Sequence, residues 1–128
     1  MGEEFLIDSN TLIEYQGRLI PPAGHDFVTK IIDERFIISI INRIEVLGSK
    51  AADKAIEDFI NLAESIELTS AIANRAIGIR KTKKIKLPDA IIAATAIEYN
   101  LTLVTRNTKD FSGIGLDIVN PHEITSTR

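Results

Sequence analysis

Cysteine and tryptophan are absent from this 128-residue sequence, and histidine occurs only twice, at positions 25 and 122. The lack of cysteine excludes disulfide scaffolds, thiol nucleophiles and zinc sites with cysteine ligands. With only two histidines, neither a histidine-built metal site nor a Ser-His-Asp triad is expected. If the protein is an enzyme, its chemistry must therefore come from carboxylates.

Long hydrophobic runs are missing as well. No apolar stretch approaches the roughly 18 residues that a membrane-spanning helix needs. Residues 1–7 are acidic rather than basic, unlike the start of a signal peptide. We therefore expect a cytoplasmic protein that does not associate with membranes.

Isoleucine is abundant, with 23 residues, and β-branched aliphatic side chains favour buried strands. A chain of this length buries one hydrophobic core but not two, so we expect a single domain over residues 1–128. Ser9 and Thr69 are expected to cap helices. The expected strands are residues 5–7, 36–41, 65–68, 101–104 and 116–119, and the expected helices are residues 10–15, 26–34, 43–47, 51–63, 70–81 and 90–99.

This alternation of short apolar strands with helices predicts an α/β fold. Such strands form a mostly parallel sheet of four to five strands that helices cover on both faces. In sheets of this kind, ligands bind outside the carboxyl ends of the strands, where the strand order switches direction.

The charges nearly balance, with 18 acidic and 15 basic residues and a net charge of −3. That balance argues against a general nucleic-acid binder. It conceals an asymmetry, however, because residues 75–86 contain six basic residues and no acid. The simplest explanation of this basic stretch is a helix end at which cations complement the helix dipole.

Four acids occur at comparable places relative to the expected elements. Asp8 follows the first strand and Glu45 lies in the helix after the second, whereas Asp89 begins a helix. Asp110 comes shortly after the fourth strand. Carboxylates that converge at one sheet edge repel one another and persist only with cations or shared protons. Oxygen ligands without histidine or cysteine favour Mg²⁺ or Mn²⁺, which activate water and neutralise charge on a phosphodiester.

Each acid also has an ordinary structural explanation. Asp8 beside Ser9 is compatible with a helix cap, and Asp89 interacts favourably with a helix dipole. Asp110 is compatible with a loop. Glu45 is compatible with a solvated helix face, although its apolar neighbours leave little exposed surface. It is the combination that indicates a site.

At these acids the sequence resembles the PIN-domain family, specifically the toxin ribonucleases of the VapC type. The resemblance is carried by four segments in order: Phe5–Thr11 (FLIDSNT), Ile38–Gly48 (ISIINRIEVLG), Leu87–Ala94 (LPDAIIAA) and Leu103–Phe111 (LVTRNTKDF). Each segment alone is a weak signal, whereas all four at these intervals are specific. Together they span nearly the whole chain.

The resemblance implies a PIN-like three-layer α/β/α sandwich and an acidic pocket that binds Mg²⁺ or Mn²⁺. It further implies endoribonuclease action on RNA, a homodimer, and a cognate antitoxin that neutralises the toxin by covering the pocket.

The resemblance also assigns roles by position. Asp8, Glu45 and Asp89 match the three main catalytic and metal-binding acids. Asn10 and Thr105 match polar residues that orient ligands. Some family members place the fourth acid at the position of Asn107 and others at that of Asp110, so Asp110 is predicted to complete the metal site with Asn107 as a supporting residue.

Because the basic stretch runs directly into Asp89, it is placed to hold phosphates beside the metal. Arg80, Lys84 and Lys86 are therefore predicted RNA contacts, and Arg106 is another. Aromatic residues make up only 5% of the chain, so base stacking is not expected to be the main binding mode.

Three alternatives remain open. Residues 8–11 partly match the D-x-D-x-T start of haloacid-dehalogenase phosphatases, but Asn10 replaces the second aspartate and the chain is too short for a cap domain. A receiver domain needs an aspartate that ends the third strand, whereas Asp58 lies in an expected helix. The stronger rival is a catalytically inactive PIN-like module that binds RNA or protein. The intact acids argue against it, and Asn107 keeps it open.

Overall fold

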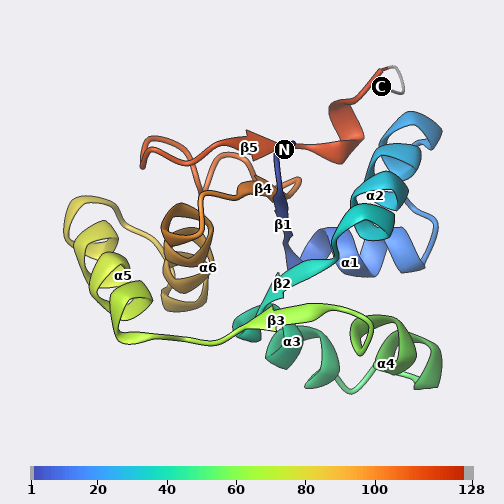
Figure 1. Cartoon of the computed structure of the whole chain (residues 1–128), viewed down its shortest axis with the longest axis horizontal. Coiled ribbons are helices and arrows are strands. Elements are labelled where there is room, and N and C mark those ends of the chain that lie inside the picture. The colour runs from blue at the N-terminus through green and yellow to red at the C-terminus, as the bar shows by residue number, and fades with distance from the viewer. Residues whose placement is uncertain (1, 126–128) are drawn as a thin grey trace.

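The computed structural model describes residues 2–125, in which strands and helices alternate as predicted (Figure 1). The elements in chain order are β1 (Phe5–Ile7), α1 (Ser9–Gln16), α2 (Pro22–Glu34), β2 (Ile37–Ser39), α3 (Ile40–Leu47), α4 (Lys54–Ile60), β3 (Glu64–Ile66), α5 (Ser70–Thr82), α6 (Leu87–Glu98), β4 (Thr102–Val104), β5 (Ile118–Val119) and a 3₁₀ helix, η1 (Pro121–Glu123). Within residues 2–125, none of the helices is long and apolar enough to cross a membrane.

All paired strands are parallel, as predicted. β1 pairs with β4, β4 pairs with β5, and β2 pairs with β3. The expected single sheet is therefore divided into a three-stranded sheet, in the order β1-β4-β5, and a two-stranded sheet, β2-β3. β1 and β2 still lie next to each other, and we call the junction between them the seam.

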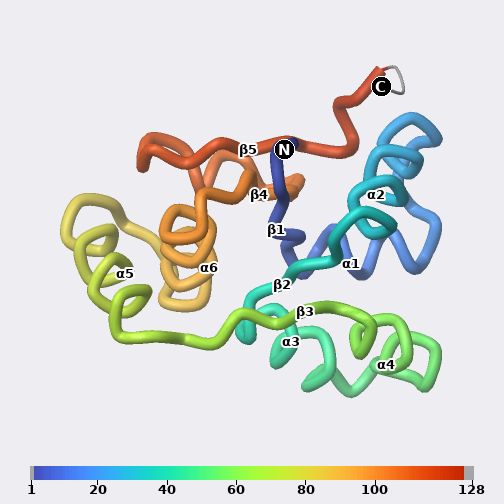
Figure 2. Tube along the Cα trace, viewed as in Figure 1, coloured from blue at the N-terminus to red at the C-terminus, as the bar shows by residue number. Residues whose placement is uncertain are grey.

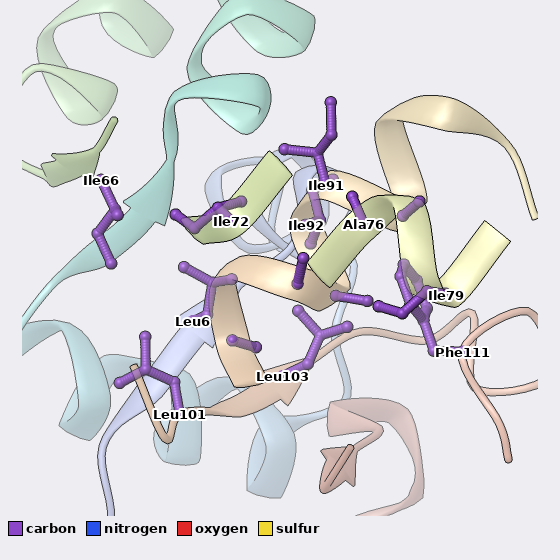
Figure 3. Packing of buried hydrophobic residues seen from close by; sticks show 14 of the residues in the cluster. Leu6, Ile66, Ile72, Ala76, Ile79, Ile91, Ile92, Leu101, Leu103 and Phe111 are labelled. Atoms are coloured by element: carbon purple, nitrogen blue, oxygen red, sulfur yellow. The ribbon is translucent and has the colours of Figure 1, made fainter. Parts of the chain in front are cut away.

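Alternate residues of each strand face opposite layers of helices, which is why both faces are apolar. Leu6, Ile37 and Leu103 pack with the residues of α5 and α6. Their neighbours Ile7, Ile38 and Val104 pack with α1, α2, α3 and α4 instead. Figure 3 shows the first of these clusters, with Leu6 and Leu103 facing the side chains of α5 and α6. The α/β fold with a parallel sheet between two helical layers is thus confirmed.

Helix α6 is the most deeply buried helix of the described chain, since every residue from 90 to 96 is buried. Four of these residues are alanines, which let α5 pack closely against α6. The one polar side chain in this run, Thr95, donates its hydroxyl hydrogen to the Ile91 carbonyl oxygen. Helix α6 packs against α5, α3 and β4. This packing fixes the position of its first turn and therefore of Asp89.

Several predicted boundaries are wrong, three of them for identifiable reasons. The cap of α1 is Asp8, whose carboxylate accepts the Ser9 N–H, rather than Ser9 itself. β2 ends at residue 39 because Ser39 caps α3, so residues 40 and 41 are helical. α2 begins at Pro22 instead of residue 26, since proline fits the first turn of a helix. α4 is also shorter than expected, whereas the Thr69 cap of α5 is confirmed.

The segment after β5 runs back across the molecule and lies beside α2 (Figure 2). Gly24 in the first turn of α2 allows this approach. A Cβ atom at Gly24 would lie 1.8 Å from the Pro121 carbonyl oxygen and 2.8 Å from the Ile20 Cγ2 atom. The contact between α2 and η1 therefore depends on the missing side chain.

Replacing Gly24 with alanine is expected to lower the free energy of unfolding by about 1–3 kcal/mol, the usual cost of an overpacked site. Gly78→Ala is the matched control, because nothing lies within 4 Å of a Cβ atom at that position in α5. It should instead raise stability by about 0.5–1 kcal/mol through helix propensity. Urea unfolding of both variants checks this, and equal effects would contradict the close approach.

Candidate metal centre

The predicted acids gather at the point where the strand order switches direction. From β1 the chain leads to β2 and β3 on one side, whereas β4 leads to β5 on the other. The crevice between the carboxyl ends of β1 and β4 is therefore the favoured ligand site of this fold. Asp8 directly follows β1, and Thr105 directly follows β4.

Asp8 is the most buried of the four acids, at 5% exposure. Its Oδ1 atom accepts hydrogen bonds from the Ser9 N–H (2.9 Å) and the Asn42 side-chain amide (3.2 Å). Its Oδ2 atom accepts the Thr105 hydroxyl hydrogen at 2.8 Å. Burial raises the pKa of Asp8 above its ordinary value, and these hydrogen bonds act in the opposite direction. The side chain is therefore held in a single orientation at the sheet edge.

Thr105 connects Asp8 to the supporting residues predicted from the sequence. Its hydroxyl oxygen accepts hydrogen bonds from the Asn10 amide (3.2 Å) and the Asn107 N–H (3.1 Å). The Asn107 side-chain amide in turn donates to the Asp110 Oδ2 atom at 2.9 Å. Asn107 thus orients the carboxylate of Asp110 through its side-chain amide.

Glu45 lies in α3 and is exposed. The expectation that its apolar neighbours leave little exposed surface is wrong, since Ile44 beside it is 61% exposed. What places its carboxylate is the Ser9 hydroxyl, which donates to the Glu45 Oε1 atom at 2.6 Å.

Asp89 interacts electrostatically with all three other acids. Partial burial, together with the negative charges of Asp8, Glu45 and Asp110, raises the pKa of Asp89 to about 6. The nearby Lys86 cation acts in the opposite direction. The four predicted acids therefore share one region. Their negative charges there are not balanced by nearby cations, so they repel one another.

A divalent cation would balance these charges. The four acids offer only oxygen ligands, the donor type that Mg²⁺ and Mn²⁺ prefer. Within residues 2–125 no three acids already stand close enough together to hold one ion. Glu45 and Asp110 are exposed, however, and each accepts one side-chain hydrogen bond that leaves its other carboxylate oxygen available, so the residues fit a cation that draws their side chains together.

The basic stretch borders the same region. A cavity of about 410 Å³ is lined by Arg80, Lys84, Ile85, Lys86, Asp89 and Asp110. The structure thus brings three of the four predicted RNA contacts into one cavity with two of the predicted acids.

Arg106, the fourth predicted RNA contact, forms an ion pair with Glu14 of α1. Glu14 is only 8% exposed, and its other oxygen lies 2.8 Å from the Nε2 atom of His122. Sequence reasoning missed Glu14 because its partners lie 92 and 108 residues away. It also missed Asn42, although the three-residue spacing from Ser39 is that of a capping box.

Comparison with known proteins relates these features to a family. The PIN-domain family model matches residues 5–115. A chain of a toxin–antitoxin complex from Klebsiella pneumoniae is 33% identical, with a TM-score of 0.74 over 94% of this chain and all of that chain. A chain of FitAcB from Neisseria gonorrhoeae and a chain of DNA-bound VapBC from Salmonella typhimurium are each 24% identical to this sequence. Both have a TM-score of 0.76 and cover 94% of this chain and 99% of theirs, and they show the fold alone. No curated protein matches the sequence.

Asp89→Asn is expected to stabilise the metal-free protein at pH 7. A raised folded-state pKa means that the folded protein loses stability as pH rises from about 4 through 6, because ionisation is easier in the unfolded chain. The variant lacks this loss and should gain about 1 kcal/mol at pH 7, since solvent screening reduces the effect at a partly buried group. The gain should vanish below about pH 4.

Urea unfolding with a chelator present, repeated from pH 4 to 8, measures this difference. Asp33→Asn, at an exposed position outside the site, is the matched control. A gain for Asp89→Asn that does not change with pH would show that repulsion among the acids is not its source.

Proposed function

Because the chain belongs to the PIN-domain family, as its four sequence motifs predicted, we propose that it is a metal-dependent endoribonuclease that hydrolyses RNA phosphodiester bonds. The observation that carries this proposal is the cavity in which Asp89 and Asp110 lie together with basic side chains of the basic stretch, next to the buried Asp8 at the sheet edge. Four acids in one region favour the binding of divalent metal ions. The neighbouring basic side chains favour a polyanionic substrate.

Asp8, Asp89 and Asp110 would hold one or two Mg²⁺ or Mn²⁺ ions, and Glu45 would complete the site directly or through water. Bound there, the metal supplies activation of water and neutralisation of charge on the phosphodiester.

The chain's own side chains orient these ligands. Thr105 holds Asp8 at its Oδ2 atom, and Asn10 holds Thr105. Asn107 holds Asp110. The chain has no cysteine, which excludes a thiol nucleophile. Water would be the nucleophile, so no covalent enzyme intermediate is expected.

Arg80, Lys84 and Lys86 line the cavity beside Asp89 and would bind phosphates of the RNA backbone. Arg106 would bind a phosphate only by exchanging its contact with Glu14. Recognition would then rest on backbone charge and RNA shape, in keeping with the few aromatic residues.

The biological role that follows is that of the toxin in a toxin–antitoxin pair. Its support is the 33% identity to a chain of a toxin–antitoxin complex over 94% of this sequence. A cognate antitoxin, a homodimer and a cytoplasmic location remain predictions of this proposal.

One observation favours the alternative of a catalytically weak or inactive PIN-like module that binds RNA or protein. Within residues 2–125, no three acids are already arranged around one point. The two functions differ in whether the acids are needed for activity, and the following substitution separates them.

Asp8→Asn is expected to abolish RNA cleavage and to remove the rise in melting temperature that Mg²⁺ produces in the unmodified protein through mass action. Asparagine keeps the size of the side chain and removes a buried charge, so the fold should persist, as circular dichroism can check. Asp53→Asn, an exposed helix cap outside the cavity, is the matched control. Undiminished cleavage by Asp8→Asn would falsify the proposed mechanism.

Replacing Lys84 and Lys86 together by glutamate should weaken RNA binding and flatten its dependence on salt. Each lost phosphate contact lowers the slope of log K against log salt by roughly 0.7–0.9. Lys30→Glu with Lys50→Glu makes the same change in net charge at exposed positions that do not line this cavity. Binding isotherms at several salt concentrations measure the slopes, and equal slopes for the two double variants would remove Lys84 and Lys86 from the RNA interface.

A further inference from the structure

One buried amide crosses the seam at the edge where the acids gather. Asn42 of α3 has no solvent exposure. Its Oδ1 atom accepts the Ser39 N–H at 2.9 Å, which closes the cap of α3 on the β2 side of the seam. Its Nδ2 atom donates across the seam to the Asp8 Oδ1 atom at 3.2 Å and to the Ser9 hydroxyl oxygen at 3.0 Å.

Ser9 extends this connection to the second acid. Because its hydroxyl oxygen accepts from Asn42, its single hydrogen is available to Glu45, whose Oε1 atom it contacts at 2.6 Å. This is the only hydrogen bond to the Glu45 carboxylate within residues 2–125. A continuous chain of hydrogen bonds therefore runs from Asn42 in α3 to Ser9 at the start of α1 and back to Glu45 in α3. We call it the relay. Asn42 also donates to Asp8.

Backbone structure does not set the separation of these two acids. Within the described residues, β1 and β2 share no ladder of hydrogen bonds. Asp8 stands at the end of one sheet, whereas Glu45 is carried by the helix that follows the other. Their relative position thus depends on side chains at the seam, and the relay is the hydrogen-bonded path that joins them.

We propose that Asn42 and Ser9 are positioning residues that hold the Asp8 and Glu45 carboxylates in register across the seam and so tune the affinity of the site for divalent cations. This inference rests on the proposed function. Neither residue needs to touch the cation or the RNA, since partners that orient ligands typically change metal affinity or activity by about 10- to 100-fold.

The decisive variant is Ser9→Ala, which removes the hydroxyl that holds Glu45 at a partly exposed position where alanine suits the helix. We expect Mn²⁺ to bind about tenfold more weakly, by calorimetry on the full chain below its melting temperature. That temperature should fall, because one N–H of the buried Asn42 amide loses its acceptor. Ser9→Thr keeps a hydroxyl and should restore the affinity. In RNA cleavage, Ser9→Ala should lower kcat without raising KM.

Asn42→Ala provides a second measurement, although it also leaves the Ser39 N–H unpaired and should lower the melting temperature. If the two residues act through one relay, combining Asn42→Ala with Ser9→Ala should weaken Mn²⁺ binding by less than the product of the single effects. Asn61→Ala is the matched control, since it removes an exposed asparagine whose contact is to Arg43.

The outcomes separate this inference from the proposed function. If the unmodified protein binds Mn²⁺ and cleaves RNA, but Ser9→Ala and Asn42→Ala bind Mn²⁺ as tightly as it does, the positioning role is wrong and the ribonuclease assignment stands. If the unmodified protein neither binds Mn²⁺ nor cleaves RNA, the proposed function is wrong and this inference is wrong with it. Weaker Mn²⁺ binding by Ser9→Ala that Ser9→Thr restores supports the inference.

Discussion

The burial of one carboxylate, that of Asp8, is the constraint on which the rest of the site depends. An ionised carboxylate is costly to remove from water unless hydrogen-bond donors replace the water. Three elements contribute such donors to Asp8: α1 through the Ser9 N–H, α3 through Asn42, and the segment after β4 through Thr105. Satisfying one acid therefore brings the ends of β1, β2 and β4 to the same place.

The remaining acids are arranged around this point in a graded way. Asp8 is buried, Asp89 is partly buried, and Glu45 and Asp110 are exposed. The pKa of Asp89 is raised to about 6 by its partial burial and by the charges of the other three. The buried Asp8 carboxylate accepts three hydrogen bonds, whereas each exposed carboxylate accepts one from a side chain. A site of this kind combines one fixed ligand with others that adjust, which suits a substrate that must enter and leave.

Much of this arrangement was predictable because it is local. Acids directly after a strand, or in the first turn of a helix, are carried to one edge by the geometry of a parallel sheet, so the gathering of Asp8, Asp89 and Asp110 could be anticipated. The basic stretch could be placed beside Asp89 from its position in the chain. The α/β class followed from the alternation of apolar runs and helical patterns.

What could not be predicted depends on partners far apart in sequence. The division of the sheet at the seam is a matter of strand geometry, which no residue pattern reports. Asn42 gains its importance from Asp8, 34 residues away, and Glu14 from Arg106 and His122. Some boundaries failed because apolar residues such as Ile40 suit a strand as well as a helix, until the Ser39 cap decides between them.

The seam also has a consequence for local unfolding of the protein. Local opening of a protein follows its weakest internal joints, and a sheet without a backbone ladder between two neighbouring strands has such a joint between them. The sheets β1-β4-β5 and β2-β3 are joined at the seam by side chains of both hydrophobic clusters rather than by a backbone ladder. Since Asp8 follows a strand of one sheet and Glu45 lies in the helix after a strand of the other, any opening at the seam would separate the two acids while each sheet keeps its own strands paired.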